Sequence, residues 1–342
     1  MVLKTETELG GIMPSYLFEL SGEHKTMCSA EALKCMEAET DSFTVVSQGP
    51  GYVIGSFDER YLDPIANRIS LTHRMGRYLG SFDIDDLSGF NDIEIPEGSF
   101  AVRGKRFEGM MKDIDSQDVI RKLGGALSRK NDVNLKEPDQ EVIVLMSDRL
   151  HVFLSERTVD RNILETRKVG ERPFFSPISL HPRFARAIIN LTGVKRGGTV
   201  IDPFCGTGGI VIEAGFMGMK AIASDFDPEM IAGTQENMDF YGLDLYDYDI
   251  LDISEISDRF GEVDAVVSDP PYGRSTHTGG EDIESIYRRA MTSFEEILKP
   301  GSAVGVVLPH PISSDTMTLE NMFMQRVHGS LTRHYHVFRK PL

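Results

Sequence analysis

The stretch Ser268-Asp269-Pro270-Pro271-Tyr272-Gly273 joins residue types that suit methyl transfer to an exocyclic amino group of a base. Such an amine is a poor nucleophile because its lone pair is delocalised into the ring, so it needs acceptors for its two hydrogens. At a reference pKa of about 3.9, Asp269 is an ionised acceptor at neutral pH. The carbonyl of Pro270 can be a rigid second acceptor because proline fixes φ. Tyr272 offers a flat face to an extruded base. We predict that these three residues are catalytic.

The same stretch could also form a surface turn, because proline and glycine commonly mark turns. Two features favour the catalytic interpretation. The stretch follows an apolar run at 263–267 that is typical of a strand, and ligands of open α/β sheets bind at the carboxyl ends of strands. A second motif upstream has the composition of a cofactor loop.

That second motif is Asp202-Pro203-Phe204-Cys205-Gly206-Thr207-Gly208-Gly209, between a predicted strand and a predicted helix. Its glycines allow a tight turn and close approach of a ligand. A dinucleotide site would have a third glycine where Val211 stands. Asp225 follows Gly206 by 19 residues, a spacing that suits a carboxylate on a ribose diol, and Asp249 could accept from an adenine amino group. The loop alone fits a nicotinamide dinucleotide or an adenosine-type cofactor, and the first stretch favours S-adenosylmethionine (SAM).

Simpler roles stay open for several of these residues. Asp202 and Asp225 are also placed to cap helices. Asp249 lies in an acid-rich stretch, where a shift of one or two residues would put another acid in its place. Cys205 has the size of a packed residue, and we interpret His310 as structural or as part of a base rim rather than as a general base.

The elements that position these motifs begin at Thr199, where strand-like and helix-like segments alternate. This alternation predicts a parallel sheet with crossover helices. The predicted strands are 200–203, 221–225, 245–250, 263–268 and 303–308, and the predicted helices are 210–217, 228–241, 253–260, 283–298 and, more weakly, 315–323. The tail, 324–340, predicts an antiparallel pair of strands at the sheet edge. Upstream, 65–79 is predicted to be helical.

Charge and composition narrow the function classes. A net charge of −17 argues against a nucleic-acid partner, but charge can be patchy. Residues 101–130 hold eight basic and four acidic side chains, and residues 157–186 hold seven and three. Such segments would suit a phosphate-binding track, although two solvated faces would look the same. The candidates for RNA contact are Arg103, Lys105, Arg106, Arg121, Lys122, Arg129 and Lys130.

Other classes find little support in the sequence. Cys28, Cys35 and Cys205 contain no CxxC pattern, so we predict neither a disulfide framework nor a metal site. No apolar run approaches the roughly 18 residues that span a bilayer. Residues 1–15 lack the apolar core of a signal peptide. We expect a cytoplasmic protein with no membrane partner.

The motifs together resemble a known family. Residues 202–209, Asp225, Asp249 and 269–273 resemble the motif series of Rossmann-type SAM-dependent methyltransferases that act on amino nitrogens. The segments 172–177 and 180–191 resemble the region before the catalytic domain in THUMP-containing RNA methyltransferases, and parts of 100–135 look like a THUMP module. About nine-tenths of the chain is similar to archaeal tRNA guanosine-10 N2-methyltransferases.

The resemblance implies an α/β fold class with a C-terminal Rossmann-like SAM methyltransferase sheet at 181–342. An α+β RNA-binding region precedes it, with a ferredoxin-like domain at 1–62, a THUMP domain at 63–157 and a linker at 158–180. The implied cofactor-binding residues are Pro177, Asp202, Phe204, Cys205, Gly206, Thr207, Gly208, Asp225, Phe226, Asp249, Ile250 and Asp269.

The implied activity is SAM-dependent methylation of N2 of guanosine 10 in tRNA, in archaea often twice. Related enzymes acting on guanosine 6 usually carry Asn where Asp269 stands, which favours position 10. The sequence leaves open N2 methylation at another tRNA position, N6-adenine methylation of RNA or DNA, a non-catalytic RNA-binding protein and a nicotinamide-dependent enzyme. It also leaves open whether one or two methyls are added and whether a small helper protein takes part.

Overall fold

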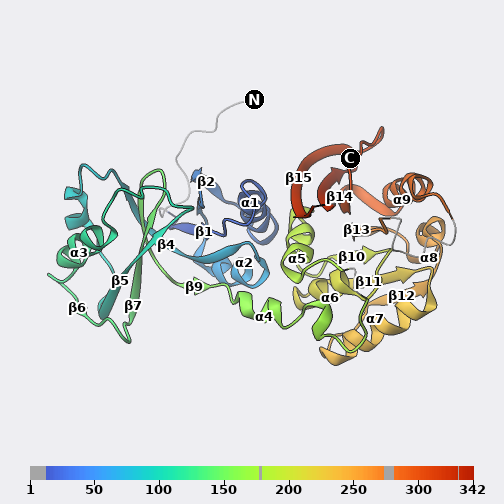
Figure 1. Ribbon diagram of the computed structural model, residues 1–342, viewed down its shortest axis with the longest axis horizontal. Coiled ribbons are helices and arrows are strands. Elements are labelled where there is room, and N and C mark those ends of the chain that lie inside the picture. Colours follow the sequence, from blue (N-terminus) through green and yellow to red (C-terminus); the bar gives the residue numbers. More distant parts are fainter. Residues whose placement is uncertain (1–12, 177–178, 273–280, 330) are drawn as a thin grey trace. The chain divides into compact units, whose positions relative to one another are not determined.

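The computed structural model describes residues 13–176, 179–272, 281–329 and 331–342, which form two compact units (Figure 1). The first unit contains the described residues up to Glu19, Thr40–Leu62 and Met75–Arg157, and the second contains Leu20–Glu39, Asp63–Arg74 and Thr158–Leu342. Compact units need not coincide with domains, so the four-part division predicted from the sequence stays a prediction.

A nine-stranded sheet lies mainly in the first unit, with the order β2-β3-β1-β4-β8-β7-β5-β6 and with β9 paired to β4. Its strands are β1 (Ser15–Leu20), β2 (Thr44–Gly49), β3 (Tyr52–Ser56), β4 (Thr72–Phe82), β5 (Ser99–Arg106), β6 (Asp132–Val133), β7 (Gln140–Met146), β8 (Leu150–Leu154) and β9 (Arg157–Thr158). β7 and β8 are antiparallel, whereas β5 runs parallel to β6 and β7. Short 3-10 turns occupy Glu59–Tyr61 and Ser88–Asp92.

Helix α3 (Ser116–Leu127) packs on β5 in this unit (Figure 1). It begins after Asp115, whose side chain accepts a hydrogen bond from the backbone N–H of Gln117. Apolar side chains spaced four residues apart are buried beneath it, namely Val119, Leu123 and Leu127. Because these share one face of the helix, Arg121 and Lys122 are left exposed on the other side.

The second unit includes helices α1 (Met27–Glu39), α2 (Leu62–Arg68) and α5 (Pro182–Leu191). The fully buried carboxylate of Glu31 in α1 accepts hydrogen bonds from the backbone N–H groups of Ser70 and Leu71 at 3.0 and 2.7 Å. It also accepts one from the Asn190 amide of α5 at 2.8 Å. These bonds satisfy a carboxylate whose pKa is raised by burial, and they hold α1 on α5.

The same contacts explain why the helix predicted over 65–79 is wrong. Helix α2 ends at Arg68, and β4 begins at Thr72. The N–H groups of Ser70 and Leu71 are taken by Glu31 instead of by carbonyls of the preceding turn. A buried acid 39 residues earlier in the chain ends this helix, and no local pattern signals it.

The seven-stranded sheet of the second unit has the order β12-β11-β10-β13-β14-β16-β15. Its strands are β10 (Thr199–Asp202), β11 (Lys220–Asp225), β12 (Asp247–Ile250), β13 (Val263–Ser268), β14 (Leu298–Leu308), β15 (Thr318–His328) and β16 (Leu331–Arg339). The remaining helices are α4 (Arg161–Glu165), α6 (Gly209–Phe216), α7 (Pro228–Phe240), α8 (Ile256–Phe260) and α9 (Ile283–Ile297), with 3-10 turns at Val169–Glu171 and Ile253–Glu255. The predicted α/β alternation is confirmed.

At the sheet edge the antiparallel pair is confirmed, but the weak helix over 315–323 is wrong. β15 starts at Thr318 and pairs with β16 along its length, and β16 in turn pairs with β14. The cross-strand pairing of a long hairpin therefore outweighs a weak helical pattern.

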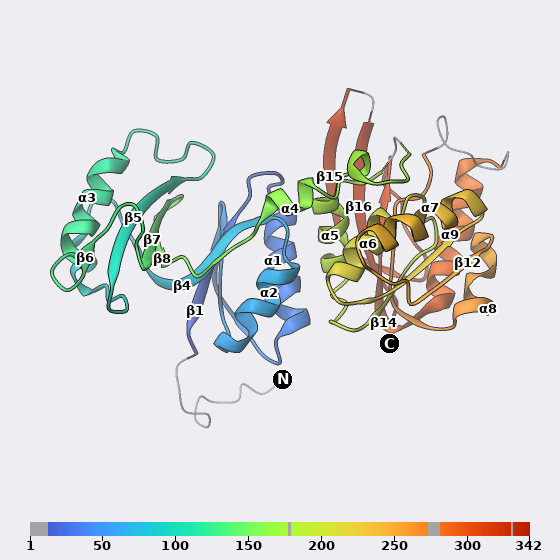
Figure 2. The ribbon, with the colours of Figure 1, turned by 90° about the horizontal axis from the view of Figure 1, so that it is seen from below.

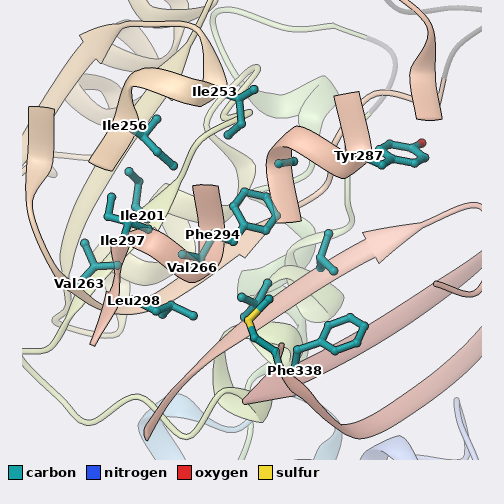
Figure 3. Close-up of a cluster of buried hydrophobic side chains, with 14 of the residues drawn as sticks. Ile201, Ile253, Ile256, Val263, Val266, Tyr287, Phe294, Ile297, Leu298 and Phe338 are labelled. Atoms are coloured by element: carbon teal, nitrogen blue, oxygen red, sulfur yellow. The ribbon is translucent and has the colours of Figure 1, made fainter. Parts of the chain in front are cut away.

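Helices flank both sides of this sheet (Figure 2). On the α9 side, Phe294 and Ile297 lie beside Ile201 of β10 and Val266 of β13 (Figure 3). All four side chains are at most 1% exposed, so the central strands are anchored by an apolar layer. The carboxyl ends of the parallel strands therefore form a fixed edge on which loops can carry polar groups.

Candidate active site

A cavity of about 370 Å³ opens at the carboxyl ends of β10, β11 and β13, within the roughly 300–1,000 Å³ of ligand pockets. It is lined by Ser176, Ser179, Leu180, Asp202, Phe204, Cys205, Gly206, Thr207, Gly209, Ile210, Asp225, Phe226, Asp227, Met230, Asp269, Pro270, Pro271 and Tyr272. The structure thus brings together the predicted catalytic residues and most of the predicted cofactor residues.

The glycine loop is held by the acid that ends β11. One carboxylate oxygen of Asp225 accepts from the backbone N–H of Gly206 at 3.0 Å, and the other accepts from the N–H of Asp227 at 3.1 Å. Gly206 and Gly208 have φ of +51° and +81°, values that side chains with a Cβ rarely adopt. The spacing between Gly206 and Asp225 therefore has a structural cause as well as a predicted role toward a ribose.

Asp202 lies at the end of β10 and is 2% exposed. Its carboxyl accepts from the Ser268 hydroxyl at 2.7 Å and from the backbone N–H of Phe204 at 3.2 Å. Burial raises the pKa of Asp202 to about 7, and the negative charges of Asp269 and Asp225 add to the rise. A cation in the cavity would favour the ionised form, because its charge opposes both effects.

The segment 167–174, which precedes the sheet in the chain, is hydrogen-bonded to the glycine loop and to α7. The side chain of Asn237 in α7 accepts from the Phe174 N–H at 3.0 Å, and it donates to the carbonyls of Phe174 and Thr207 at 2.8 and 2.9 Å. Arg172 donates to the Thr207 hydroxyl at 3.2 Å and to the Arg167 carbonyl at 2.9 Å. Residues 167–174 are therefore tied to the loop that lines the cavity.

In the stretch predicted to be catalytic, the Tyr272 hydroxyl donates a hydrogen bond to the carboxylate of Asp269. The Tyr287 hydroxyl of α9 donates to the carbonyl of Pro271 at 2.8 Å. Burial raises the pKa of Asp269, whereas the charge of Arg333 and the bond from Tyr272 lower it. The stretch is thus held at the cavity wall with an acceptor available, while Gly273 lies outside the described residues.

Three predicted cofactor residues do not line this cavity, and Pro177 lies outside the described residues. Gly208 shapes the turn of the glycine loop through its positive φ, but it is not a wall residue of the cavity. The Asp249 carboxylate binds Arg259 Nε at 2.6 Å, and Ile250 is 49% exposed. A neighbouring cavity of about 240 Å³ is lined by Leu251, Asp252, Phe204, Phe226, Pro271 and five further residues. Two acids line this second cavity, Asp252 and Glu281, and Asp249 is not among its wall residues.

The sequence reasoning missed several wall residues. Asp227 and Met230 start α7, and their position was predictable because helices after parallel strands begin at the ligand edge. Ser176, Ser179 and Leu180 come from the segment before the sheet. No local pattern places that segment over the loop.

The predicted RNA-contacting residues lie in the first unit, and most have acidic or carbonyl partners. Salt bridges join Arg103 to Glu141, Arg121 and Lys122 to Asp118, and Lys130 to Glu94. Arg106 donates to the carbonyls of Met110 and Ile114 at 3.1 and 2.8 Å, so it supports a turn. Lys105 and Arg129 are exposed and form no ion pair within the described part of the chain. Exposed ion pairs contribute little free energy, so phosphates can displace them.

His310 and Cys205 both have neighbours that suit a structural role. His310 Nε2 lies 3.1 Å from Glu284, and its ring lies beside Tyr287. Cys205 is 4% exposed, and burial raises its pKa well above the usual thiol value. Neither is poised as a base or nucleophile.

Comparison with known proteins agrees with this geometry. Residues 169–335 match the RMKL-like methyltransferase domain family, and residues 90–154 match the THUMP domain family. The chain is 33% identical to a tRNA (guanine(10)-N2)-dimethyltransferase of Methanothermobacter thermautotrophicus, over 92% of this chain and 96% of that protein. The chain belongs to the tRNA (guanine(10)-N2)-dimethyltransferase family.

Solved structures share the fold of this family member. TrmN from Thermus thermophilus matches with a TM-score of 0.54 at 21% identity, over 95% of this chain and 99% of that one. SMU.472, a putative methyltransferase complexed with SAH, matches with a TM-score of 0.53 at 15% identity, over 97% and 100% of the two chains. At such identities the likeness establishes the arrangement of elements alone.

None of the helices in the described residues combines the length and the apolar character that a membrane span requires. Within the same residues no group of three or more His, Cys, Asp or Glu side chains could hold a metal ion.

Proposed function

We propose that this protein transfers methyl groups from SAM to the exocyclic N2 of guanosine 10 in tRNA. The observation that carries the proposal is the meeting of Asp269, Pro270 and Tyr272 with the glycine loop in one cavity, in a chain of this family. The name of the Methanothermobacter relative, a dimethyltransferase, supports a second transfer to the same nitrogen.

The residues present fit the cofactor by their chemistry. Asp225 ends the second parallel strand and offers a carboxylate for a ribose diol. Asp202 offers a buried carboxyl that a cationic ligand would ionise, and Gly206, which has no side chain, lets the backbone approach the ligand closely. Bound SAM would supply an electrophilic methyl group to this cavity.

The chain's own residues prepare the amine. The carboxylate of Asp269 and the carbonyl of Pro270 accept the two N2 hydrogens, which directs the nitrogen lone pair toward the methyl donor. Tyr272 borders the same space and packs on the base after it leaves its stack, a step that costs a few kcal/mol. Most of the acceleration then comes from positioning. Asp269 takes up the proton that N2 loses, directly or through water.

The THUMP match at 90–154 supports a tRNA-gripping role for the first unit. Exposed basic side chains on and near α3 face solvent there, among them Lys122 and Arg129. Contacts of this kind hold an RNA by its backbone and shape rather than by its bases.

The competing reaction is N6 methylation of adenine, which could use the same acceptor arrangement. An unmodified tRNA transcript incubated with the protein and methyl-labelled SAM, followed by nucleoside analysis, separates the two. We expect label in N2-methylguanosine and N2,N2-dimethylguanosine. Label in N6-methyladenosine, or none at all, would contradict the proposal.

A further inference from the structure

Arg333 reaches the catalytic stretch from a distant part of the chain. β16 runs antiparallel to β14, with Leu308 opposite His334, so β16 starts at the edge where the parallel strands end. Ser268, the last residue of β13, pairs with Val306 of β14, two residues before β14 ends at Leu308. Asp269 and Arg333 therefore lie at the same edge of the sheet, although 64 positions separate them in the sequence.

The guanidinium of Arg333 lies close enough to this edge to interact electrostatically with Asp269, Tyr272 and Tyr335. The residue is only 9% exposed, and its buried Nε has no acceptor among the described residues. A charge this deep is costly unless it is compensated, and the carboxylate of Asp269 is the negative group that compensates it.

Several charged or titratable groups among the described residues interact with Asp269. Asp202 of β10 adds negative charge, and Tyr272, Tyr287 and Tyr335 add phenols whose pKa values are all raised by burial. Within the described residues, Arg333 is the cation whose charge acts on this carboxyl.

We propose that Arg333 is a positioning residue for methyl transfer: with Tyr272 it holds the Asp269 carboxylate ionised and fixed as the acceptor for the substrate amine. The effect of Arg333 on catalysis rests on the proposed function, whereas its effect on Asp269 does not. A protonated Asp269 would carry an O–H donor and would be a weaker acceptor for the amine hydrogens.

The direction of the effect follows from the two opposing causes. Burial raises the pKa of Asp269, and the charge of Arg333 lowers it. An opposite charge within about 4–6 Å typically lowers a carboxyl pKa by about 1–3 units. Removing the charge should therefore raise the pKa, so that Asp269 is ionised only at higher pH.

The test compares Arg333→Met, which keeps length without charge, with Arg333→Lys, which keeps charge. Carbon-13 NMR of labelled aspartate carboxyls measures the Asp269 titration without any substrate, and the resonance is assigned by its absence in Asp269→Asn. We expect the titration midpoint to rise by about one unit or more in Arg333→Met and to stay near the wild-type value in Arg333→Lys. An unchanged midpoint in a folded Arg333→Met protein would overturn the inference.

The pH profile of kcat/KM for methyl transfer then links the titration to catalysis. We expect the acidic limb to move to higher pH in Arg333→Met, with activity recovering in alkaline buffer, and to stay in place for Arg326→Met, an exposed arginine on β15. A uniform loss at every pH would instead indicate a merely structural role. If the wild-type protein transfers no methyl, the proposed function fails, whereas the NMR titration still decides the role of Arg333.

Discussion

At the scale of single residues, the central feature is an acceptor held by neighbours rather than a reactive nucleophile. Asp269 accepts a hydrogen bond from the Tyr272 hydroxyl, and the positive charge of Arg333 lowers its pKa. The stretch itself is anchored by Tyr287, which donates to the Pro271 carbonyl at 2.8 Å. In the proposed mechanism the site orients an amine, so geometry and charge matter more than nucleophilicity.

Replacing Asp269 by Ala should abolish methyl transfer and leave SAM binding intact. The variant loses the ionised acceptor for the amine, whereas Asp202, Asp225 and the glycine loop keep their hydrogen bonds. We expect kcat to fall by at least about 100-fold, the scale of lost acid–base or acceptor groups. Single-turnover transfer and SAM calorimetry measure the two properties. Asp258→Ala, an exposed acid on α8, is the control, and near-normal turnover of Asp269→Ala would show that the assignment is wrong.

The sequence could predict much of this site at the residue scale, since its motifs are short and follow strands. The link between Gly206 and Asp225 joins two strand ends that are neighbours in the sheet. Arg333 could not be predicted, because its place depends on a hairpin that returns to the ligand edge. The pairing of the Asp249 carboxylate with Arg259 could not be predicted either, because Arg259 lies on a separate helix ten residues further along the chain.

At the scale of elements, the segment before the sheet supports the cofactor loop from outside. Phe174 packs directly against Gly233 of α7, where an added Cβ would lie 2.0 Å from the ring. Asn237, one turn further along α7, bonds to both Phe174 and Thr207. Helix α7 thus couples the segment before the sheet to the glycine loop, through the close contact at Gly233 and the side-chain amide of Asn237.

Gly233→Ala should weaken SAM binding by displacing this segment. The methyl group cannot be accommodated without moving Phe174, and overpacking of this kind costs about 1–3 kcal/mol. We expect a lower Tm and a several-fold higher Kd for SAM, measured by thermal unfolding and calorimetry. Gly170→Ala in the same segment is the matched control, since an added Cβ there meets nothing within 4 Å. Equal behaviour of the two variants would contradict the coupling.

Prediction at the element scale succeeded where one pattern dominated. The alternation after Thr199 gave the strands and helices of the parallel sheet, because buried parallel strands are short apolar runs between amphipathic helices. It failed at 65–79 and 315–323, where a buried Glu31 and a long β-hairpin decide the conformation. Both causes are contacts between distant parts of the chain.

At the scale of the whole molecule, an acidic protein with net charge −17 is proposed to bind a polyanion. The charge is distributed unevenly, and several exposed cations of the first unit lie in salt bridges, such as Lys130 with Glu94 at 2.6 Å. Phosphates can replace acidic partners at exposed sites because such pairs are weak. Affinity for tRNA should therefore depend strongly on salt.

The double variant Lys105→Ala/Arg129→Ala should bind tRNA less tightly. Each lost phosphate contact should reduce the slope of log K against log salt by about 0.7–0.9, with SAM affinity unchanged. Filter binding across a salt series measures the slope. Lys25→Ala/Lys195→Ala removes two exposed charges from the second unit and should leave the slope as it is. An equal loss in both double variants would argue against a track in the first unit.

The central claim, transfer to N2 of guanosine 10, is tested most directly with a tRNA that carries inosine at position 10. Inosine lacks only the exocyclic amine of guanosine, so binding should be retained. We predict that labelled SAM methylates the guanosine-10 tRNA and leaves the inosine-10 tRNA unlabelled, with similar Kd values for both. Label on the inosine-10 tRNA at the normal rate would contradict the claim and would place the reaction at another atom or another nucleotide.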